Sequence, residues 1–471
     1  MNKTKTIATI GPATQKKEVL RYLIINGVDL IRFNMNYASQ DFCLDILDKL
    51  KTIDKELNTN TGIIVDLSGP SIRINSLIGG QAELKVGTKI RIYMEKVLGD
   101  STKFSVSYPN LIDEVKYDSK IKISDGTVEL KVIDKQYNYL LCEVEKGGTI
   151  FDNQKIVIPD HHLNLDFLDK QDRDNIKFAD EINADFLSLS FVSSAEDVLQ
   201  VNDFLIELGN DHIEILAKIE NEDACLAIDD IIKASDGIII ARGDLGISLP
   251  VERIPGIQKS IISKCHKQGK LSIVATELLS SMENASRPTR AEVSDVANAV
   301  LDGADAVVLC GETTVGKHPI ETLIMMEKIM RSAEIDLNHL EFLDRAARSE
   351  KQDVTGVLAH SIVECANRLK CKAIVVPTMS GLTAKKISRF RPSCPIIAIT
   401  PNLEIVKSLN LYFGIKSILI DDLKTFDEIT NKAKEIACKE MDLQESDKII
   451  ITGGYPFKKI KHTNFIKIEE I

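Results

Sequence analysis

The chain has 471 residues, of which 44% are hydrophobic and 27% are charged, and its formal net charge is −11. This length accommodates roughly two to four domains, and the composition is that of a soluble globular enzyme. The net negative charge argues against nucleic acid and an anionic membrane as partners, because both require a basic protein surface. An anionic substrate therefore requires a local cluster of cations.

Nine cysteines are scattered along the chain without a C-x-x-C pair, which argues against a disulfide framework and against a zinc site. The N-terminus runs directly into a strand-like stretch, with no apolar leader in front of it. No apolar run approaches the roughly 18 residues of a membrane helix. We therefore expect a cytoplasmic protein with reduced thiols and no membrane partner.

Short β-branched runs alternate with amphipathic segments, which is typical of a parallel sheet with helices outside it. The strands predicted from these runs are 4–11, 28–34, 61–68, 184–191, 214–220, 235–244, 271–278 and 304–313. The helices predicted between them include 170–182, 194–208, 222–233, 254–268 and 317–333. Eight strands of this kind over this length predict a TIM (β/α)8 barrel.

The spacing of the strands is interrupted once, by a segment that we place at 71–158. Apolar and polar residues alternate there between Gly and Asp turns, which predicts an inserted antiparallel all-β lid domain. The barrel is therefore expected in two parts, 1–70 and 159–342. The charged stretch 343–353 is predicted to be a linker. Five further β-branched runs predict a separate α/β domain over 354–471.

Polar residues end almost every predicted barrel strand, and in a TIM barrel this end of the strands carries the active site. The period of two places Lys218 and Glu220 on one side of their strand, and likewise Arg242 and Asp244. Two carboxylates from neighbouring strands can hold one Mg²⁺ and leave positions for substrate oxygens. Other polar residues at these ends are Arg32, Asn34, Asn36, Asp66, Ser68, Ser190, Thr276 and Glu312.

The octapeptide GETTVGKH at 311–318 comes close to a nucleotide-binding P-loop. That motif requires a Ser or Thr hydroxyl for Mg²⁺ after its lysine, and His318 occupies this position. We therefore do not assign this segment as a phosphate-binding loop.

Longer motifs show a resemblance to one enzyme family. They are TIATIGPAT (6–14), DLSGPSIR (66–73), SDGTV (124–128), KIEN (218–221), IIIARGDLG (238–246), RPTRAEVSDVANAVLDGADAVVLCGET (287–313) and TNFIKI near the C-terminus. Together they resemble pyruvate kinase from end to end, including the order of barrel, inserted β domain, barrel and C-terminal domain. In that family the GETT loop lines the active site.

The resemblance implies transfer of a phosphoryl group from phosphoenolpyruvate to ADP, giving pyruvate and ATP. It implies Mg²⁺ or Mn²⁺ at Glu220 and Asp244, and it implies a β domain that closes as a lid. The catalytic residues that it implies are Arg32, Lys218 and Thr276. The substrate-binding residues that it implies are Arg32, Arg73, Gly243, Asp244 and Thr276.

The same resemblance implies three further sites and an oligomeric state. The nucleotide side is expected at Pro12, Asn34 and Arg73. K⁺ is expected at Asn34, Asn36, Asp66 and Leu67. The loop TMSGLTAKK (378–386) resembles the family's sugar-phosphate effector site, with Thr378, Ser380, Gly381 and Thr383 as binding residues. The family also suggests a homotetramer.

The chain departs from the family pattern mainly on the nucleotide and cation side. Asn36 replaces a Ser, Tyr37 a His and Gln171 a Lys; Leu67 and Ser71 replace a Thr and a Glu, and Cys310 replaces a Ser. The effector loop near the C-terminus is also altered, reading GGYPFKKIKHTN. We expect a high KM for ADP and a K⁺ requirement that is weak or dispensable.

Two alternatives to an active kinase stay open. One is a weakly catalytic or regulatory pyruvate kinase homologue. The other is a Mg²⁺-dependent enolpyruvate aldolase or lyase on a barrel, which also uses paired carboxylates and an arginine. An assay for ATP formed from phosphoenolpyruvate and ADP separates the three.

Overall fold

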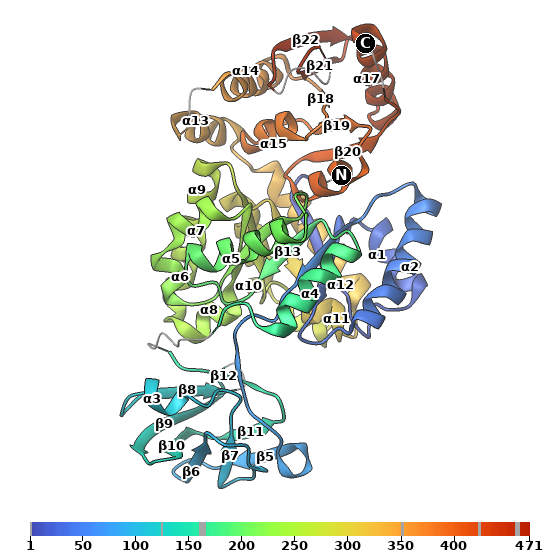
Figure 1. Cartoon of the computed structure of the whole chain (residues 1–471). Coiled ribbons are helices and arrows are strands. Elements are labelled where there is room, and N and C mark those ends of the chain that lie inside the picture. The colour runs from blue at the N-terminus through green and yellow to red at the C-terminus, as the bar shows by residue number, and fades with distance from the viewer. Residues whose placement is uncertain (1, 124–125, 160–165, 350–352, 423–424, 457–461) are drawn as a thin grey trace.

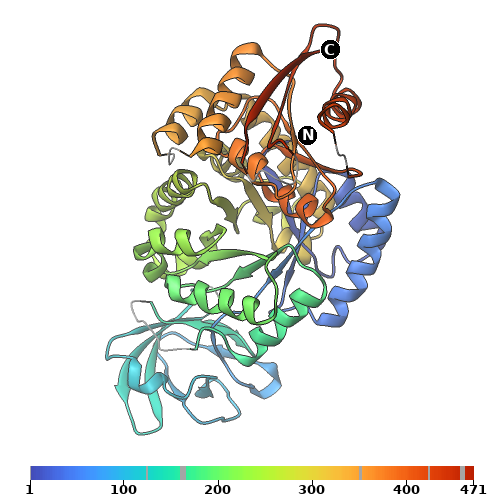
Figure 2. The same cartoon turned by 45° about the horizontal axis from the view of Figure 1, so that its top comes forward.

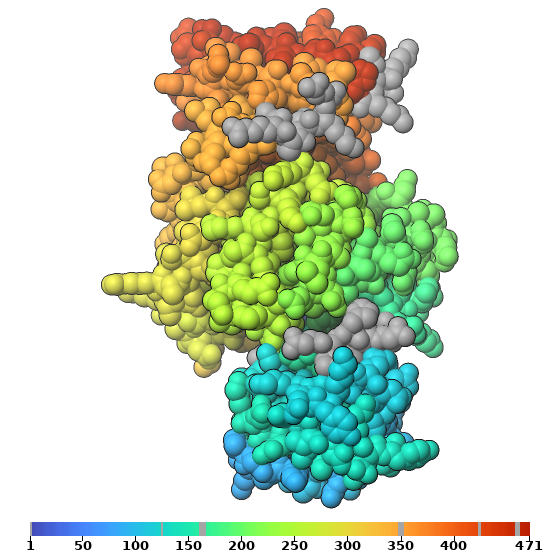
Figure 3. Space-filling view, turned by 90° about the vertical axis from the view of Figure 1, so that its left-hand side faces the viewer, coloured from blue at the N-terminus to red at the C-terminus, as the bar shows by residue number. Residues whose placement is uncertain are grey.

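The computed structural model describes residues 2–123, 126–159, 166–349, 353–422, 425–456 and 462–471. Three domains lie end to end, with the barrel between the inserted domain and the C-terminal domain (Figure 1). Figures 2 and 3 show the same order from other directions. The predicted fold class is confirmed, whereas the domain boundaries stay a prediction.

Eight parallel strands close into a barrel in the order β1-β17-β16-β15-β14-β13-β3-β2. Each predicted strand is shorter in the structure. Most of them lose C-terminal residues to the loop or helix that follows, whereas the second strand keeps Asn34 as its last residue and is shorter only at its start. The strands are β1 (Lys5–Thr9), β2 (Leu30–Asn34), β3 (Gly62–Asp66), β13 (Phe186–Leu189), β14 (Glu214–Ile219), β15 (Gly237–Ala241), β16 (Leu271–Ala275) and β17 (Ala306–Leu309).

Helices surround the barrel, and the capping signals in the sequence explain several of their boundaries. Ser194 and Asp197 form a reciprocal capping box at one helix start, and Thr289 and Glu292 form another. Gly303 ends the second of these helices at φ +97°, where a Cβ would clash with His266 and Phe342. The helices are α1 (Lys17–Ile25), α2 (Gln40–Leu57), α4 (Lys170–Glu181), α5 (Ala195–Glu207), α6 (Glu222–Leu226), α7 (Ile228–Ala234), α8 (Arg242–Ser248), α9 (Ile254–Gln268), α10 (Arg290–Asp302), α11 (Gly311–Thr314) and α12 (Pro319–Ile335), with 3₁₀ turns η2 (Val251–Arg253) and η3 (Ser280–Glu283).

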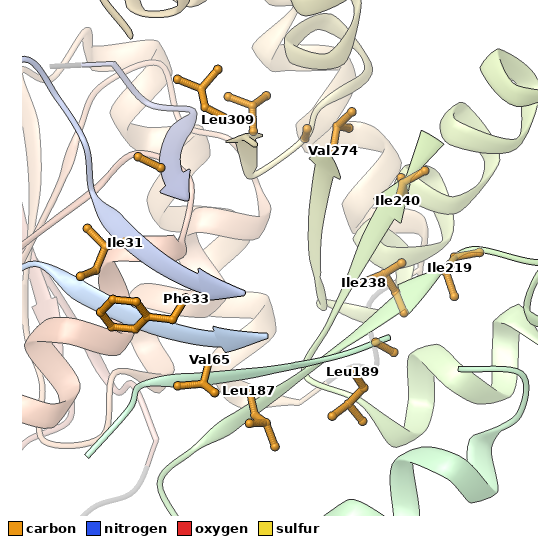
Figure 4. Close-up of a cluster of buried hydrophobic side chains, with 14 of the residues drawn as sticks. Ile31, Phe33, Val65, Leu187, Leu189, Ile219, Ile238, Ile240, Val274 and Leu309 are labelled. Carbon is orange, nitrogen blue, oxygen red and sulfur yellow. The ribbon is translucent and has the colours of Figure 1, made fainter. Parts of the chain in front are cut away.

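The barrel strands are buried on both faces, so their residues divide between two apolar clusters. Alternate residues such as Ile31, Phe33 and Leu187 pack with the surrounding helices, and Figure 4 shows this set. Their neighbours, such as Leu30 and Ile64, belong to the other cluster. Both sets are apolar along the strands, so the charged residues of the barrel gather at the strand ends.

The inserted domain is a β structure with its own apolar core. Two details correct the prediction of an antiparallel all-β insert. Strands β6 and β7 pair in parallel, because the chain between them loops back before β7 begins, and a short helix α3 (Leu111–Glu114) is present. The sheets are β4-β12-β8-β9-β10-β6-β7 and β11-β5, formed by β4 (Ile72–Arg73), β5 (Gln81–Leu84), β6 (Lys89–Tyr93), β7 (Lys103–Ser105), β8 (Lys120–Ile123), β9 (Val128–Lys135), β10 (Tyr139–Lys146), β11 (Gly148–Phe151) and β12 (Lys155–Val157), with the 3₁₀ turn η1 (Ile78–Gly80).

The C-terminal domain contains a five-stranded sheet in the order β20-β19-β18-β21-β22, whose last pair is antiparallel. The segment 343–353, predicted to link the two domains, is helical over most of its length. Helix α13 (His339–Ser349) covers 343–349, because Phe342, Leu343 and Ala346 form a buried stripe on one side of it. Residues 350–352 lie outside the described residues. The other elements are α14 (Val354–Leu369), β18 (Ala373–Pro377), α15 (Leu382–Arg389), β19 (Ile396–Thr400), α16 (Leu403–Ser408), η4 (Leu409–Leu411), β20 (Ile415–Leu419), α17 (Phe426–Glu440), β21 (Lys448–Gly453) and β22 (Phe465–Glu470).

Among the helices of the described residues, none is both long and apolar enough to cross a membrane.

Candidate active site

The charged residues predicted at the strand ends meet at the end of the barrel that faces the inserted domain (Figure 1). Three cations of the inserted domain contact barrel atoms there. Arg73 Nη2 donates to Asn36 Oδ1 at 2.5 Å, and Lys122 Nζ donates to the Ile247 carbonyl at 2.6 Å. Lys155 Nζ lies 3.0 Å from Asp244 Oδ1. The inserted domain and the barrel therefore contact each other at the site.

Arg32, two residues before the end of β2, and Asp66, the last residue of the neighbouring β3, form a buried ion pair. Arg32 Nη2 contacts Asp66 Oδ2 at 2.5 Å, and Arg32 Nη1 donates to Thr9 Oγ1 at 2.9 Å. Burial alone would disfavour the charge on Arg32, but the Asp66 carboxylate outweighs it, and the pKa of Arg32 is raised. The guanidinium is thereby fixed in orientation and fully charged.

Lys218 lies between two buried carboxylates. Its Nζ is 3.0 Å from Glu220 Oε1 and 3.6 Å from Asp66 Oδ1, and it donates to Ser190 Oγ at 2.8 Å. Burial opposes the ammonium charge, yet Asp66 and Glu220 outweigh it, so the pKa of Lys218 is raised. An ammonium in this place presents a permanent positive charge to a ligand at the barrel end.

Glu220 follows β14 and is 2% exposed. Its Oε2 accepts the Phe191 N–H at 2.7 Å, whereas Oε1 makes no hydrogen bond despite its distance of 3.0 Å to Lys218 Nζ. Burial raises the pKa of Glu220, and the nearby Asp244 charge raises it further against the effect of Lys218. A buried carboxylate oxygen without a hydrogen bond has a lone pair available for a cation.

Asp244 lies in the first turn of α8 and faces the inserted domain. Burial would raise the pKa of Asp244, but Lys155 and Lys218 outweigh it and hold the pKa below its usual value. The Lys155 ammonium also lies 3.5 Å from the centre of the Phe191 ring. Lys155 is therefore a site residue that sequence reasoning missed, because it lies in the inserted domain and not at a barrel strand end.

The prediction that Arg242 and Asp244 share one side of a strand is wrong. Strand β15 ends at Ala241 and α8 begins at Arg242, so the period of two does not apply to them. Arg242 instead donates to the Thr276 and Glu277 carbonyls and pairs with Asp295 on α10.

Thr276 follows β16 and contacts the start of α8. Its Oγ1 accepts the Gly243 N–H at 2.8 Å and donates to the Ala275 carbonyl at 2.6 Å. Thr276 has φ +66°, a left-handed conformation that is strained for a β-branched residue. The structure thus brings Thr276 and Gly243 together, next to Asp244.

The residues predicted for K⁺ are already engaged in hydrogen bonds. Asn34 Oδ1 accepts the Asn36 N–H at 3.1 Å, and Asn36 Oδ1 accepts from Arg73. The Leu67 carbonyl accepts from Ser190 Oγ at 2.8 Å, and Asp66 accepts from Ser188 Oγ as well as from Arg32. Of the remaining residues on the nucleotide side, Pro12, Tyr37 and Gln171 have exposed side chains.

The GETT segment forms helix α11 after β17 and binds backbone groups instead of presenting a phosphate cradle. Glu312 is buried and accepts the N–H groups of Cys310 and Leu279 at 2.8 and 3.2 Å. Thr313 Oγ1 donates to the Thr9 carbonyl at 2.8 Å. Cys310 Sγ lies 3.5 Å from Arg32 Nη1, so the replaced serine position does reach the active site.

The predicted effector loop precedes α15, and most of its hydroxyls are engaged. Thr378 Oγ1 accepts the Gly381 N–H at 2.9 Å, and Thr383 Oγ1 lies 2.8 Å from Thr463 Oγ1 in the interior. Gly381 has φ +78°, and Ser380 is exposed. In the altered loop GGYPFKKIKHTN, residues 457–461 lie outside the described residues, as do residues 124 and 125 of SDGTV.

Glu220 and Asp244 fit a hard divalent cation, since both are carboxylates and the buried Glu220 Oε1 makes no hydrogen bond. Among the residues that the structure describes, no three His, Cys, Asp or Glu side chains gather into a complete metal site. Mg²⁺ does not require one, because it is commonly held by one or two carboxylates together with substrate oxygens and water.

The closed barrel with this charged end defines an α/β-barrel enzyme. The family model "Pyruvate kinase, barrel domain" matches residues 1–323, and "Pyruvate kinase, alpha/beta domain" matches residues 357–469. The pyruvate kinase of Clostridium perfringens is 38% identical over the full length of both chains. That of Geobacillus stearothermophilus is 37% identical over the whole of this chain and 80% of its own.

Among solved structures, a pyruvate kinase from Cryptosporidium parvum aligns with a TM-score of 0.92 at 33% identity, over all of this chain and 96% of the other. The chain therefore belongs to the pyruvate kinase family and is a phosphotransferase. Nothing in these comparisons favours the regulatory-subunit or aldolase alternatives.

Proposed function

We propose that this chain transfers a phosphoryl group from phosphoenolpyruvate to ADP, with the residues at the barrel end acting on the substrate. The observation that carries this proposal is the continuous buried set of charges Arg32, Asp66, Lys218 and Glu220. Phosphoryl transfer depends mainly on positioning and on neutralising the charge of the transferred group. Fixed cations supply both.

Arg32, Arg73 and Lys218 would surround the phosphoryl group. Asp66 contacts both Arg32 and Lys218, so their positions are set before substrate binds. Arg73 comes from the inserted domain and contacts Asn36 on the barrel. Closure of the inserted domain would therefore deliver one phosphate ligand and exclude water, which competes as phosphoryl acceptor.

Glu220 and Asp244 would hold Mg²⁺ or Mn²⁺. When bound, the metal supplies Lewis-acid stabilisation of the phosphoryl and enol oxygens. Lys155 pairs with one oxygen of Asp244, Oδ1, so a metal that binds this carboxylate would compete with the Lys155 ammonium. A Lys155 ammonium displaced in this way would bind a phosphate group of phosphoenolpyruvate or of ADP.

The carboxylate of phosphoenolpyruvate would bind at the start of α8, where backbone N–H groups near Gly243 and Asp244 favour an anion. Thr276 lies beside this position and its hydroxyl bonds to Gly243. We assign Thr276, together with ordered water, to the protonation of the enolate after transfer.

ADP and K⁺ would bind more weakly here than the family pattern implies. The oxygens of Asn34 and Asn36 and the Leu67 carbonyl accept protein hydrogen bonds, and a cation must compete with these donors. Tyr37 and Gln171 replace cationic donors to the nucleotide. These observations support a high KM for ADP and a weak K⁺ requirement.

Two regulatory features complete the proposal. The loop at Thr378, Ser380, Gly381 and Thr383 would bind a sugar phosphate, chiefly through backbone N–H groups and Ser380, since both threonine hydroxyls are engaged. The test adds fructose bisphosphate, ribose 5-phosphate, glucose 6-phosphate and AMP in turn. A phosphoenolpyruvate saturation curve that none of them changes would refute the effector site.

The chain would also assemble as a homotetramer, which light scattering after gel filtration tests.

A coupled assay tests the proposed reaction. Purified protein with Mg²⁺, phosphoenolpyruvate and ADP should form pyruvate and ATP. A regulatory homologue would bind phosphoenolpyruvate without turnover, and an aldolase would release pyruvate from a longer oxo-acid without nucleotide.

A further inference from the structure

Two consecutive residues after β16 have left-handed backbone conformations. Thr276 has φ +66° and Glu277 has φ +52°, and neither is glycine. The conformation is unfavourable for any L-residue with a Cβ and especially for a β-branched one. Such a conformation persists only where surrounding groups hold it.

Arg242 supplies the groups that hold this turn. Its Nε and Nη2 donate to the Thr276 carbonyl at 3.3 and 2.8 Å, and Nη2 also donates to the Glu277 carbonyl at 2.7 Å. Its Nη1 pairs with Asp295 Oδ2 at 2.6 Å. The Arg242 side chain is 7% exposed, so these bonds form largely out of water and are correspondingly strong.

The same turn is part of the proposed substrate site. Thr276 Oγ1 accepts the N–H of Gly243, and Gly243 directly follows Arg242 in the chain. A Cβ at position 243 would lie 3.4 Å from Thr276 Oγ1, so the β16 turn and the start of α8 are in close contact. The Arg242 side chain therefore connects the start of α8 to the β16 turn on the side away from the substrate. The hydrogen bond between Thr276 and Gly243 connects the same two segments on the substrate side.

We propose that Arg242 is a positioning residue that keeps the Thr276–Glu277 turn in its left-handed conformation and so fixes Thr276 against Gly243. Asp295 orients Arg242 for this role. The inference rests on the proposed function for the roles of Thr276 and Gly243. A guanidinium is suited to it, because its planar set of donors reaches two carbonyls and a carboxylate at once, which an ammonium cannot reproduce.

The test compares Arg242→Met and Arg242→Lys with Arg253→Met, which removes an exposed arginine of η2 that pairs only at the surface with Glu222. The readouts are kcat, the separate KM values for phosphoenolpyruvate and ADP, and binding of oxalate to the Mn²⁺-loaded protein by calorimetry. Oxalate is a planar dianion that resembles the enolate of pyruvate.

Arg242→Met should lower kcat/KM for phosphoenolpyruvate and weaken oxalate binding at least tenfold, with the KM for ADP unchanged. Arg242→Lys should recover part of the loss, and Arg253→Met should behave as wild type. Added guanidinium should partly restore Arg242→Met, because a hollow of about 340 Å³ between α8, α9 and α10 reaches the Arg242 position.

Unchanged phosphoenolpyruvate kinetics and oxalate affinity in folded Arg242→Met would overturn the proposal, as would equal losses toward both substrates. If that variant does not fold, Asp295→Asn replaces it. This variant should show a smaller loss, confined to the kinetics of phosphoenolpyruvate and the affinity for oxalate. The absence of any loss would overturn the proposal. A wild-type protein without turnover would refute the proposed function alone, since oxalate binding still reports on Arg242.

Discussion

Replacing Glu220 by Gln separates the proposed metal site from a purely structural cluster. The change keeps the shape of the side chain and removes one metal-ligating charge. If the metal acts as the Lewis acid, turnover should fall on the order of 10³-fold, which corresponds to about 4 kcal/mol of transition-state stabilisation. The measurement is the initial rate at saturating substrates across a Mg²⁺ titration.

Folding should respond differently from turnover. Burial and the Asp244 charge raise the pKa of Glu220, so its ionised form is costly in the metal-free protein, and Gln removes that cost. Lys218 keeps Asp66 and Ser190 as partners, so the thermal midpoint should stay within a few degrees of wild type or rise. Glu222→Gln, two residues away on the surface, is the matched control. Near-normal turnover of Glu220→Gln at saturating Mg²⁺ would refute the metal assignment.

Lys218→Met should abolish phosphoryl transfer and leave a soluble protein with a thermal midpoint within a few degrees of wild type. The fold should tolerate the change because Asp66 keeps Arg32 as its partner and Glu220 can take up a proton. Loss of soluble protein would instead indicate that Lys218 is a structural residue. Initial rates over ADP at fixed phosphoenolpyruvate, with and without K⁺, should show a high KM for ADP and little K⁺ dependence, and an ordinary KM with an absolute K⁺ requirement would contradict the proposed weakening. Burial raises the pKa of Asp185 to about 7, so the protonated carboxyl favours folding below that pH and this contribution is lost as the pH rises from about 4 to above 7. Asp185→Asn should therefore raise the thermal midpoint at pH 8 by more than at pH 5, and an equal effect at both would show that the carboxyl is not perturbed.

The barrel could be predicted from the sequence because burial on both faces makes each strand a continuous apolar run. The same runs overestimated the length of most strands at their polar C-terminal ends. Arg242 shows the consequence: read as the end of a strand, it was expected beside Asp244, whereas as the first residue of α8 it contacts the β16 turn. The local pattern does not distinguish the last residue of a strand from the first residue of a helix.

Residues brought together by distant parts of the chain could be predicted only where a pattern links them. Asp66 ends β3, and Arg32 and Lys218 lie within two residues of the C-terminal ends of β2 and β14, so closure of the barrel places the three side by side. Lys155 contacts Asp244 from another domain, and no periodicity relates an inserted strand to a barrel loop. The helix at 343–349 was missed because its charged residues obscured the apolar stripe of Phe342, Leu343 and Ala346.

The central claim is phosphoryl transfer between phosphoenolpyruvate and ADP at the barrel end, and ³¹P NMR of one reaction mixture tests it most directly. With purified protein, Mg²⁺ and both substrates, the phosphoenolpyruvate signal should decline while the γ-phosphate signal of ATP grows in equal amount. A phosphoenolpyruvate signal that stays constant, or that declines into inorganic phosphate without ATP, would contradict the account.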